Sequence, residues 1–538
     1  MVRKITSNPL FTLFVLYLLA YGFMLINEGV WWDDWCIYNK NAEGITDAFT
    51  GNGAFYIAPI HIFLQGLTNN APLVYHYLTF FLYFITSIFL YFTLPYLKID
   101  GNTQFVLTAI FTVLPINIAR IYMICFPYTL GVFFCFAGLY FFTVALYKKH
   151  LLSRLLALVC SFLSFILIPS AYVFIPMYIT LLLWINSINH KCSFIENFRS
   201  FIQKTLRYID FIILTIFTWC LYLICVKPSG SYAEGNYNSF SWESIIKLPF
   251  DLVVSYVENL LKLSWISNLL HSAFVAIMFI IIFIFLLIIF RKKFFLPLQN
   301  HTCTLLFRGK TITLSVLLIM GLYFFIAGVI AYIAVEKTPT SMHLPDTRYQ
   351  SLLGIGYSLT ILGLLLTFIR EKYFKYAFIF LLSVFITNNA EKCLVFQRLH
   401  YKNLAFMEAM STNDTVLNNR NFIMIDSTPL IDNHACSYSI QGMARKTFGD
   451  ETRFIISKEE FSKFSIHFDL DKRIYNMRDV QFNGSFDYYL IIEEGSVKLR
   501  RTAPFVKLLF FDLFNKKRFH QDIANILQIT CLPYQNEF

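Results

Sequence analysis

The sequence predicts a polytopic α-helical membrane protein of about eleven transmembrane helices, with a small soluble α/β domain at its C-terminal end. Three observations lead to this fold class. Hydrophobic residues make up 57% of the 538 residues and charged residues only 14%, whereas roughly 25% of residues are charged in soluble domains. Apolar runs long enough to cross a membrane recur along the chain. Beyond residue 390 these runs shorten, and charged stretches separate them.

Each predicted span is an apolar run that approaches the roughly 20 residues needed to cross about 30 Å of hydrocarbon. The runs are residues 9–26, 71–97, 103–119, 122–147, 151–168, 171–187, 208–226, 266–290, 311–335, 350–369 and 375–390. No small-residue cleavage site follows the first run, which predicts an uncleaved span rather than a signal peptide. At Pro169, "LIPSAY" fits either a tight turn between two spans or a kink within one longer span.

Lysine and arginine clusters predict the orientation, because cytoplasmic loops carry an excess of both. If the spans alternate, one side of the membrane receives Arg3, Lys4, Lys98, Lys148, Lys149 and the basic segments 191–207, 291–310 and 370–375. We therefore expect a cytoplasmic N-terminus and a periplasmic C-terminal domain, as in a bacterial inner-membrane protein. The exoplasmic side then receives the loops 27–70, 227–265 and 336–350 and everything after residue 390.

Composition also excludes several classes of function. The formal net charge of +11 comes from the basic clusters between apolar runs, so we predict no nucleic-acid partner. The 11 cysteines form no CxxC pair, which argues against a zinc site and a redox framework. We therefore predict no metal-ligating residues. No cofactor is implied with certainty, and a divalent cation stays open as a possible one. The sequence has no GxxxxGK followed by Ser or Thr, which disfavours an ATP-driven transporter.

We place the membrane domain at residues 1–390 and the exoplasmic α/β domain at residues 391–538. The first stretch of the second domain, "EKCLVFQRLHYKNLAFMEAM", is predicted to continue helically from the last span. Three apolar segments, "NFIMID", "DYYLIIEE" and "FVKLLFFDLF", are predicted as buried strands. We interpret Asp426, at the end of the first of them, as a turn residue. In the loop 227–265, "ESIIKLPFDLVVSYVENLLKL" has helical spacing and is predicted to lie along the membrane interface.

An acidic pair stands out in the first exoplasmic loop, where "NEGVWWDDWCIYNK" follows the first span. Trp31, Trp32 and Trp35 fit an interfacial belt. A carboxylate near the hydrocarbon boundary is costly, and a helix cap needs one carboxylate rather than two. Adjacent side chains on a helix diverge by about 100°, so one carboxylate would do chemistry while the other orients it or the substrate. We predict that Asp33 and Asp34 are catalytic.

The span layout and this acidic pair resemble the GT-C superfamily of glycosyltransferases. Further along the same loop, "FYIAPIHIFL" with Pro59 and His61 looks like the segment that follows the acidic pair in the protein mannosyltransferase and aminoarabinose transferase branches. The nearest functional class is the O-antigen glucosyltransferases, which typically show an Asp-Asp followed by a Gly-Arg. This chain lacks that Gly-Arg, so the sugar and the acceptor stay open.

The resemblance implies transfer of a sugar from a polyprenyl-phosphate donor to a surface glycan or lipid-linked acceptor. It also implies membrane lipids as neighbours, catalysis on the exoplasmic face and inversion at the anomeric carbon. One general base suffices, because the departing phosphate leaves as an anion. By analogy of position we assign Asp33 as that base, and Asp34 to orientation or acceptor binding.

The leaving phosphate needs cationic partners, and arginine offers two donors in a fork. Arg120 and Arg348 are the exoplasmic candidates, although either side chain could instead extend to lipid headgroups. His343 and Asp346 beside Arg348 could be a donor and an ion partner, or solvated loop residues. With His61, these residues form the predicted substrate-binding set.

Two other functions remain open at this point. An O-antigen polymerase would also use exoplasmic arginines but would not require the acidic pair. A lipid-linked sugar flippase or transporter should place charges at mid-membrane depth, and the apolar runs are nearly free of them.

Overall fold

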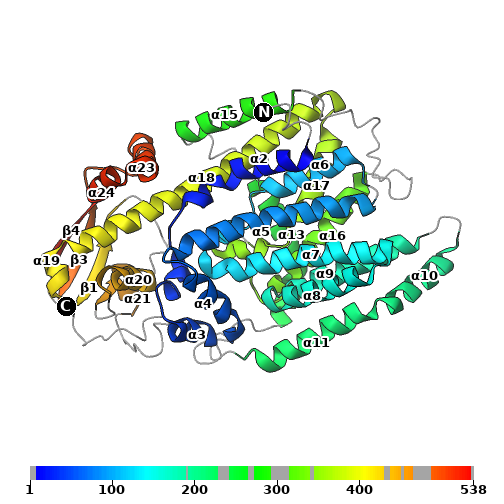
Figure 1. Ribbon diagram of the computed structural model, residues 1–538, viewed down its shortest axis with the longest axis horizontal. Helices are drawn as coiled ribbons and strands as arrows, with labels where there is room; N and C mark the ends of the chain where they lie inside the picture. Colours follow the sequence, from blue (N-terminus) through cyan, green and yellow to red (C-terminus); the bar gives the residue numbers. More distant parts are fainter. Residues whose placement is uncertain are drawn as a thin grey trace.

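The chain is a helical membrane protein with a small sheet near its C-terminus (Figure 1). The computed structural model describes residues 8–51, 53–97, 99–188, 192–227, 242–263, 272–291, 314–339, 345–428, 437–449, 453–464 and 486–534. By length and composition, five helical segments in these ranges could cross a membrane: Pro9–Ile26, Ala71–Leu97, Met123–Lys148, Val316–Ile333 and Lys372–Ser411. The helices α10 (Phe194–Arg207) and α11 (Ile209–Cys225), bent by 56°, could make a sixth span. Five further apolar helices are shorter than 18 residues.

The long helices lie side by side in one bundle (Figure 1). Its members are α2 (Pro9–Tyr21), α5 (Ala71–Thr93), α6 (Gly101–Val113), α7 (Phe126–Lys148), α8 (Leu151–Leu167), α9 (Ala171–Ser187), α15 (Ala273–Ile289), α16 (Leu314–Ile333), α17 (Gly354–Phe368) and α18 (Glu371–Ser411). The segment at Pro169 is a turn between α8 and α9, so the first of the two predicted alternatives is confirmed.

Small residues allow the closest helix pairs to form, as is common in membrane bundles. A Cβ atom on Gly131 of α7 would lie 2.2 Å from Cγ1 of Ile168, at the end of α8. A Cβ atom on Gly356 of α17 would lie 2.7 Å from the backbone nitrogen of Phe325 in α16. These two contacts show how glycine allows neighbouring helices of the bundle to approach closely.

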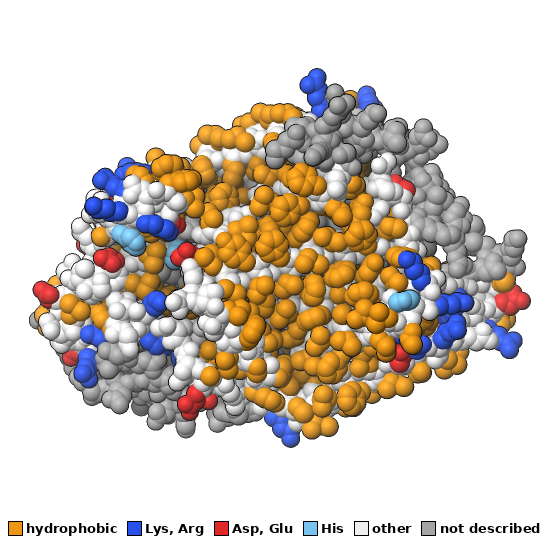
Figure 2. All heavy atoms as spheres, viewed as in Figure 1, with side chains coloured by type: hydrophobic (Ala, Val, Ile, Leu, Met, Phe, Trp, Pro, Cys, Tyr) orange, Lys and Arg blue, Asp and Glu red, His pale blue; other side chains and the backbone are white. Residues whose placement is uncertain are grey.

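The outer surface of the bundle is apolar. Figure 2 shows hydrophobic side chains covering the middle of the visible face, with charged side chains mainly around its rim. Leu151 and Val159 of α8 and Ile213 and Ile216 of α11 are among the exposed hydrophobic side chains. An apolar surface of this extent requires a lipid environment rather than water.

The predicted interfacial helix is α13 (Trp242–Leu263), and one of its faces packs on the bundle beside α16. Asn259 is buried, donates to the carbonyl of Pro339 at 3.0 Å and accepts from Nε2 of Gln350 at 2.8 Å. The opposite face exposes Ile246 and Phe250. The helix is confirmed, and its predicted position at the interface stays a prediction.

The loop between α2 and α5 is largely helical. It contains the 3₁₀ turns η1 (Gly22–Ile26), η2 (Trp32–Cys36) and η3 (Phe55–Ile57) and the helices α3 (Ala42–Thr50) and α4 (Ala58–Gly66). Four other 3₁₀ turns follow later: η4 (Leu94–Leu97), η5 (Ile118–Ile121), η6 (Met123–Cys125) and η7 (Pro345–Gln350). The carboxylate of Asp34 connects η2 to η6 by accepting from the amide of Ile124.

The predicted helical continuation beyond residue 390 is confirmed. The single helix α18 runs for 41 residues, so position 390 lies within an unbroken helix that leads from the bundle to the sheet (Figure 1). The strands are β1 (Asn421–Asp426), β2 (Phe454–Ser457), β3 (Tyr488–Glu494) and β4 (Leu527–Pro533). Their order is β2-β1-β3-β4, with β1 parallel to both neighbours and β4 antiparallel to β3. The helices around them are α19 (Asp414–Asn418), α20 (Ser437–Phe448), α21 (Lys458–Phe464), α23 (Thr502–Phe514) and α24 (Lys516–Ile523).

Two of the three predicted strands are confirmed as β1 and β3, but the third prediction is wrong. The segment "FVKLLFFDLF" belongs to the helix α23. Phe505 and Leu508, three residues apart, are buried, while Val506 and Phe510 are exposed, which is the spacing of one helical face. The sequence misleads because an almost continuous apolar run has no visible period.

Candidate functional site

The acidic pair lies on η2, whose backbone is strained at its first residue. Trp32 has a φ of +49°, in the left-handed region that a bulky side chain rarely adopts. Such a conformation costs about 1–3 kcal/mol and persists only where the surroundings hold it. Here the amide of Asp34 donates to the carbonyl of Trp31 at 3.0 Å, which closes the turn. The turn carries Asp33 and Asp34 on different sides of η2.

Asp34 is fully buried. Its Oδ1 accepts from the amide of Ile124 at 2.8 Å, and its Oδ2 accepts from the amide of Trp31 at 3.3 Å. Burial raises the pKa of Asp34 to about 8, although the hydrogen bonds from backbone amides of Ile124, Met123 and Trp31 oppose this shift. With both oxygens bound to backbone amides, Asp34 fixes η2 against η6. This geometry suits a positioning residue.

The surroundings of Asp33 differ from those of Asp34. Asp33 lines a cavity of about 750 Å³. The wall on this side also contains Trp32 and Cys36 of η2 and Cys125 at the end of η6. The carboxylate of Asp33 therefore shares this wall with Arg348, which lines the same cavity.

Arg348 lies in η7 and lines the same cavity. Its guanidinium carbon is 5.2 Å from the centre of the Trp32 ring and 4.8 Å from that of Tyr349. Its Nη2 donates to the hydroxyl of Tyr349 at 2.7 Å and lies 3.8 Å from Oδ1 of Asp346. Because this ion pair is long and the Asp346 side chain is 40% exposed, Asp346 neutralises the Arg348 guanidinium only in part. The remaining positive charge acts on the cavity.

The rest of the cavity wall is mainly apolar and aromatic. It is built from the ends of several bundle helices and from α11: Tyr128 of α7, Leu167 of α8, Tyr172 and Val173 of α9, Trp219, Tyr222 and Leu223 of α11, and Tyr332 of α16. Trp219 and Leu223 are largely exposed side chains of α11. The cavity therefore joins a charged side to an apolar side, as an amphipathic ligand requires.

The other predicted binding residues lie elsewhere. Arg120 is buried between the rings of Tyr21 and Tyr83, whose centres lie 4.5 and 4.1 Å from its guanidinium carbon. Its Nε and Nη2 donate to the carbonyls of Asn117 and Ile116 at 2.9 and 2.7 Å. Arg120 neither lines the cavity nor extends to lipid headgroups. Its placement favours a structural role.

His61 is likewise outside the cavity wall. Its ring stacks on Phe49 and its Nδ1 is 2.8 Å from the hydroxyl of Tyr75. Burial lowers the pKa of His61 to about 3, which keeps the imidazole neutral. This favours a structural role for His61 too. His343 lies outside the described residues.

Sequence reasoning missed Lys337, a second cation on the cavity wall, whose Nζ is 5.9 Å from the centre of the Tyr349 ring. A signal was present, because Lys337 stands in the same segment, residues 336–350, as Arg348. The aromatic wall carried no such signal, because tyrosine and tryptophan at the ends of spans are ordinary in membrane proteins.

The helix α20, which lies beside the sheet, holds η2 from the other side. Nη2 of Arg445 in α20 donates to the carbonyls of Trp35 and Tyr38 at 2.8 and 3.0 Å. The hydroxyl of Ser439 donates to the carbonyl of Trp32 at 3.4 Å. A Cβ atom on Gly442 would lie only 2.7 Å from Cβ of Trp35, so α20 needs glycine to approach this closely.

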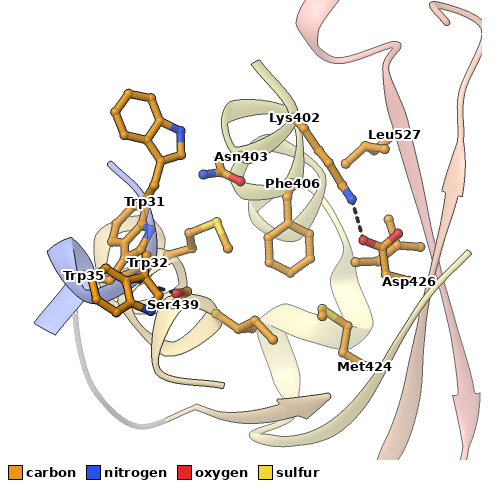
Figure 3. A pocket seen from close by; sticks show the side chains of 13 residues that line it. Trp31, Trp32, Trp35, Lys402, Asn403, Phe406, Met424, Asp426, Ser439 and Leu527 are labelled. Carbon is orange, nitrogen blue, oxygen red and sulfur yellow. Dashed lines mark hydrogen bonds and ion pairs between the residues drawn. The ribbon is translucent and has the colours of Figure 1, made fainter. Parts of the chain in front are cut away.

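A second, smaller pocket of about 40 Å³ lies between η2, α18 and the sheet (Figure 3). Three tryptophans of the first loop form one side, and Asn403 and Phe406 of α18 form another. Nζ of Lys402 is 2.5 Å from Oδ2 of Asp426, across the end of β1. We call this space the sheet-edge pocket. It shares Trp32 with the larger cavity.

In the part of the chain that the structure describes, no three His, Cys, Asp or Glu side chains gather closely enough to hold a metal ion. The possible divalent cation therefore has no site made of such ligands there. Comparison with known protein families and with characterised proteins gives no match for this chain.

Proposed function

We propose that the chain is an integral-membrane glycosyltransferase of the GT-C type with about eleven spans. It transfers a sugar from a polyprenyl-phosphate donor to a surface glycan or lipid-linked acceptor on the periplasmic face of a bacterial inner membrane. One observation supports the proposal above all: a single cavity combines the carboxylate of Asp33, the guanidinium of Arg348 and a largely apolar wall. A lipid-linked sugar phosphate needs these three environments together.

In the proposed reaction the acceptor hydroxyl attacks the anomeric carbon of the donor sugar. The Asp33 carboxylate takes the proton of that hydroxyl, and a new glycosidic C–O bond forms. The bond between the anomeric carbon and the phosphate oxygen breaks, and its electron pair leaves with the polyprenyl phosphate. Because attack and departure occur on opposite faces of the carbon, the configuration inverts. The leaving group departs as an anion and needs no general acid.

Arg348 is placed to stabilise the charge that develops on the phosphate. Its planar guanidinium can donate to two phosphate oxygens, which a single ammonium group cannot do with the same geometry. Lys337 on the same wall adds a second positive charge. The apolar side formed by α9 and α11 suits the first isoprene units of the donor, while its remaining chain lies in the bilayer.

The positions of the charges also bear on the two rival functions. A flippase or transporter is expected to hold charges at mid-membrane depth. Arg348 and Lys337 instead lie outside the helices α16 and α17 that flank them. A polymerase would use the arginine but has no need for Asp33. The combination favours the transferase.

The deciding experiment compares asparagine variants at the two aspartates. Asparagine is nearly isosteric with aspartate but cannot accept the proton, and a general base contributes about 10²- to 10⁴-fold. In membranes supplied with lipid-linked sugar, Asp33→Asn should therefore lower kcat by about that factor with little change in the melting temperature. Asp47→Asn is the matched control, because Asp47 is exposed on α3 in the same loop and does not line the cavity.

Asp34→Asn should behave differently from Asp33→Asn. The amide replaces one carboxylate oxygen with an N–H donor, so either Ile124 or Trp31 loses a hydrogen-bond acceptor. We expect lower stability together with reduced transfer. Near-parental transfer in both single variants would mean that the pair is purely structural, and the transferase proposal would lose its main support.

A further inference from the structure

We propose that the sheet-edge pocket is an acceptor subsite, which holds the hydroxyl-bearing edge of a neutral sugar. The term acceptor rests on the proposed function, whereas sugar binding at this place does not. The described residues that line the pocket come from four separate parts of the chain, namely η2, α18, α20 and the sheet. Figure 3 shows the side chains of Trp35, Ser439, Phe406 and Met424 around one space, with the indole of Trp31 turned away from it.

The topology of the sheet places the pocket where α/β sheets commonly bind ligands. Met424 and Asp426 lie toward the carboxyl end of β1, and Ile492 toward that of β3. From β1 the chain passes by way of α20 to β2, whereas from β3 it passes by way of α23 and α24 to β4. These two destinations lie at opposite edges of the sheet. Ligands bind in the crevice at such a switch point, outside the carboxyl ends of the strands.

The chemistry of the lining fits a sugar. Indole rings offer apolar faces to the C–H face of a pyranose, and side-chain amide, hydroxyl and carboxylate groups pair with its hydroxyls. Trp32, Trp35, Asn403, Ser439 and Asp426 supply these groups in the pocket.

The charge of the pocket favours a neutral ligand over an anion. Lys402 is buried, but its ammonium already pairs with Asp426, and no other ionisable side chain occurs among the described residues that line the pocket. Asp426 also accepts at Oδ1 from the amide and the hydroxyl of Thr428, at 2.9 and 2.7 Å. A carboxylate offers about four acceptor positions, so one remains for a ligand hydroxyl.

The volume of the pocket and its closeness to the larger cavity fit a subsite that holds the acceptor sugar beside the proposed base. A volume of about 40 Å³ is about three times what one water needs, so it fits the edge of one ring rather than a whole saccharide. Trp32 belongs to the walls of both the pocket and the larger cavity. A sugar anchored at the sheet edge would therefore lie beside Asp33, the proposed base.

The test measures sugar binding directly, with the full chain in lipid nanodiscs. Saturation-transfer NMR would be recorded with D-glucose, D-galactose and N-acetyl-D-glucosamine, and with D-glucuronate as the anionic probe. We expect binding of at least one neutral sugar in preference to the glucuronate. Asp426→Asn and Asn403→Leu should each weaken it roughly ten- to hundred-fold, because each removes hydrogen-bonding groups from the pocket.

Lys498→Met is the matched control, because Lys498 pairs with Glu494 near the end of β3 without lining the pocket. It should bind sugar like the parent. The pocket proposal is overturned if the parent binds no neutral sugar, if glucuronate binds better, or if both pocket variants bind like the parent. It is equally overturned if the control loses binding together with them. Should Asp426→Asn fail to fold, Asn403→Leu alone decides, because Asn403 is only partly buried.

The two proposals fail separately. In Asp33→Asn we expect transfer to be lost while sugar binding stays at the parental level. If Asp33→Asn keeps full transfer, the proposed function is wrong, and the NMR measurement still decides whether the pocket binds sugar. If sugar binding ignores the pocket variants while Asp33→Asn is inactive, only the subsite is wrong.

Discussion

Replacing Gly442 by alanine should displace the turn that carries Asp33. Gly442 lies within α20, and its Cα faces the side chain of Trp35 in η2. A Cβ atom there would lie 2.7 Å from both Cβ and Cε3 of Trp35, whereas ordinary contacts begin at 3.4 Å. The two elements must therefore separate by about 0.7 Å, because Cβ of Trp35 is bonded directly to the backbone and no side-chain rotation moves it away.

The size of the effect follows from this displacement. Overpacking of this kind costs about 1–3 kcal/mol of folding free energy. A misplacement of about 1 Å near the chemistry can cost about 10²-fold in rate. We therefore expect Gly442→Ala to lower transfer by roughly ten- to hundred-fold and to lower the melting temperature as well. Gly442→Val, with two more methyl groups, should act more strongly.

The assay combines transfer in nanodiscs with hydrogen exchange of residues 31–38, whose protection should fall. Gly66→Ala is the control, since Gly66 is also helical and a Cβ atom there meets nothing within 4 Å. Alanine at Gly66 should leave exchange unchanged. If Gly442→Ala matched the parent in transfer, stability and exchange, then α20 would not hold η2 in place.

The other predictions concern charge and topology. Arg348→Lys keeps the charge but loses the guanidinium fork, so the KM for the lipid-linked donor should rise about tenfold or more. Arg120→Lys should instead lower stability, because it loses the contacts to two backbone carbonyls, and should leave the donor KM near the parental value. Because the pKa of Asp34 is raised to about 8 against about 3.9 in an unfolded chain, the folded state retains a proton that the unfolded state releases. Between these pH values the free energy of unfolding should therefore fall as pH rises, and Asp34→Asn should flatten this slope in thermal melts. A reporter that is active only in the cytoplasm, fused after the last residue, should stay silent, and a strong signal would reverse the predicted topology.

Much of the helical architecture could be predicted from the sequence, because hydrophobic length alone marks a helix in a membrane protein. The turn at Pro169 was one of two open alternatives, since a proline can also kink a continuous helix. The helix α23 was missed because its apolar run has no visible period, and β4 because "LQITCLP" is short and ends in proline. In both cases the side chains that pack against the segment decide its structure.

The candidate site was predictable in part for a similar reason. Alternating spans assign Asp33, Arg120 and Arg348 to one side of the membrane, but they do not say which arginine shares a cavity with the carboxylate. That difference arises from Tyr21 and Tyr83, two rings from distant segments that enclose Arg120. The sequence also does not show which of Asp33 and Asp34 is the positioning residue. That role of Asp34 depends on its hydrogen bond from the amide of Ile124, 90 residues away in the chain.

The unbroken helix α18 also fixes the rotation and the distance of the sheet relative to the bundle. One residue inserted near position 390 would turn everything beyond it by about 100° and advance it by about 1.5 Å. Lys402 and Asn403 would then face away from η2, although the bundle and the sheet could each stay intact. An insertion of seven residues would nearly restore the facing side but would push the sheet about 10 Å outward. The length of the helix between the two parts is therefore fixed by the contacts that α20 and α18 make with the first loop.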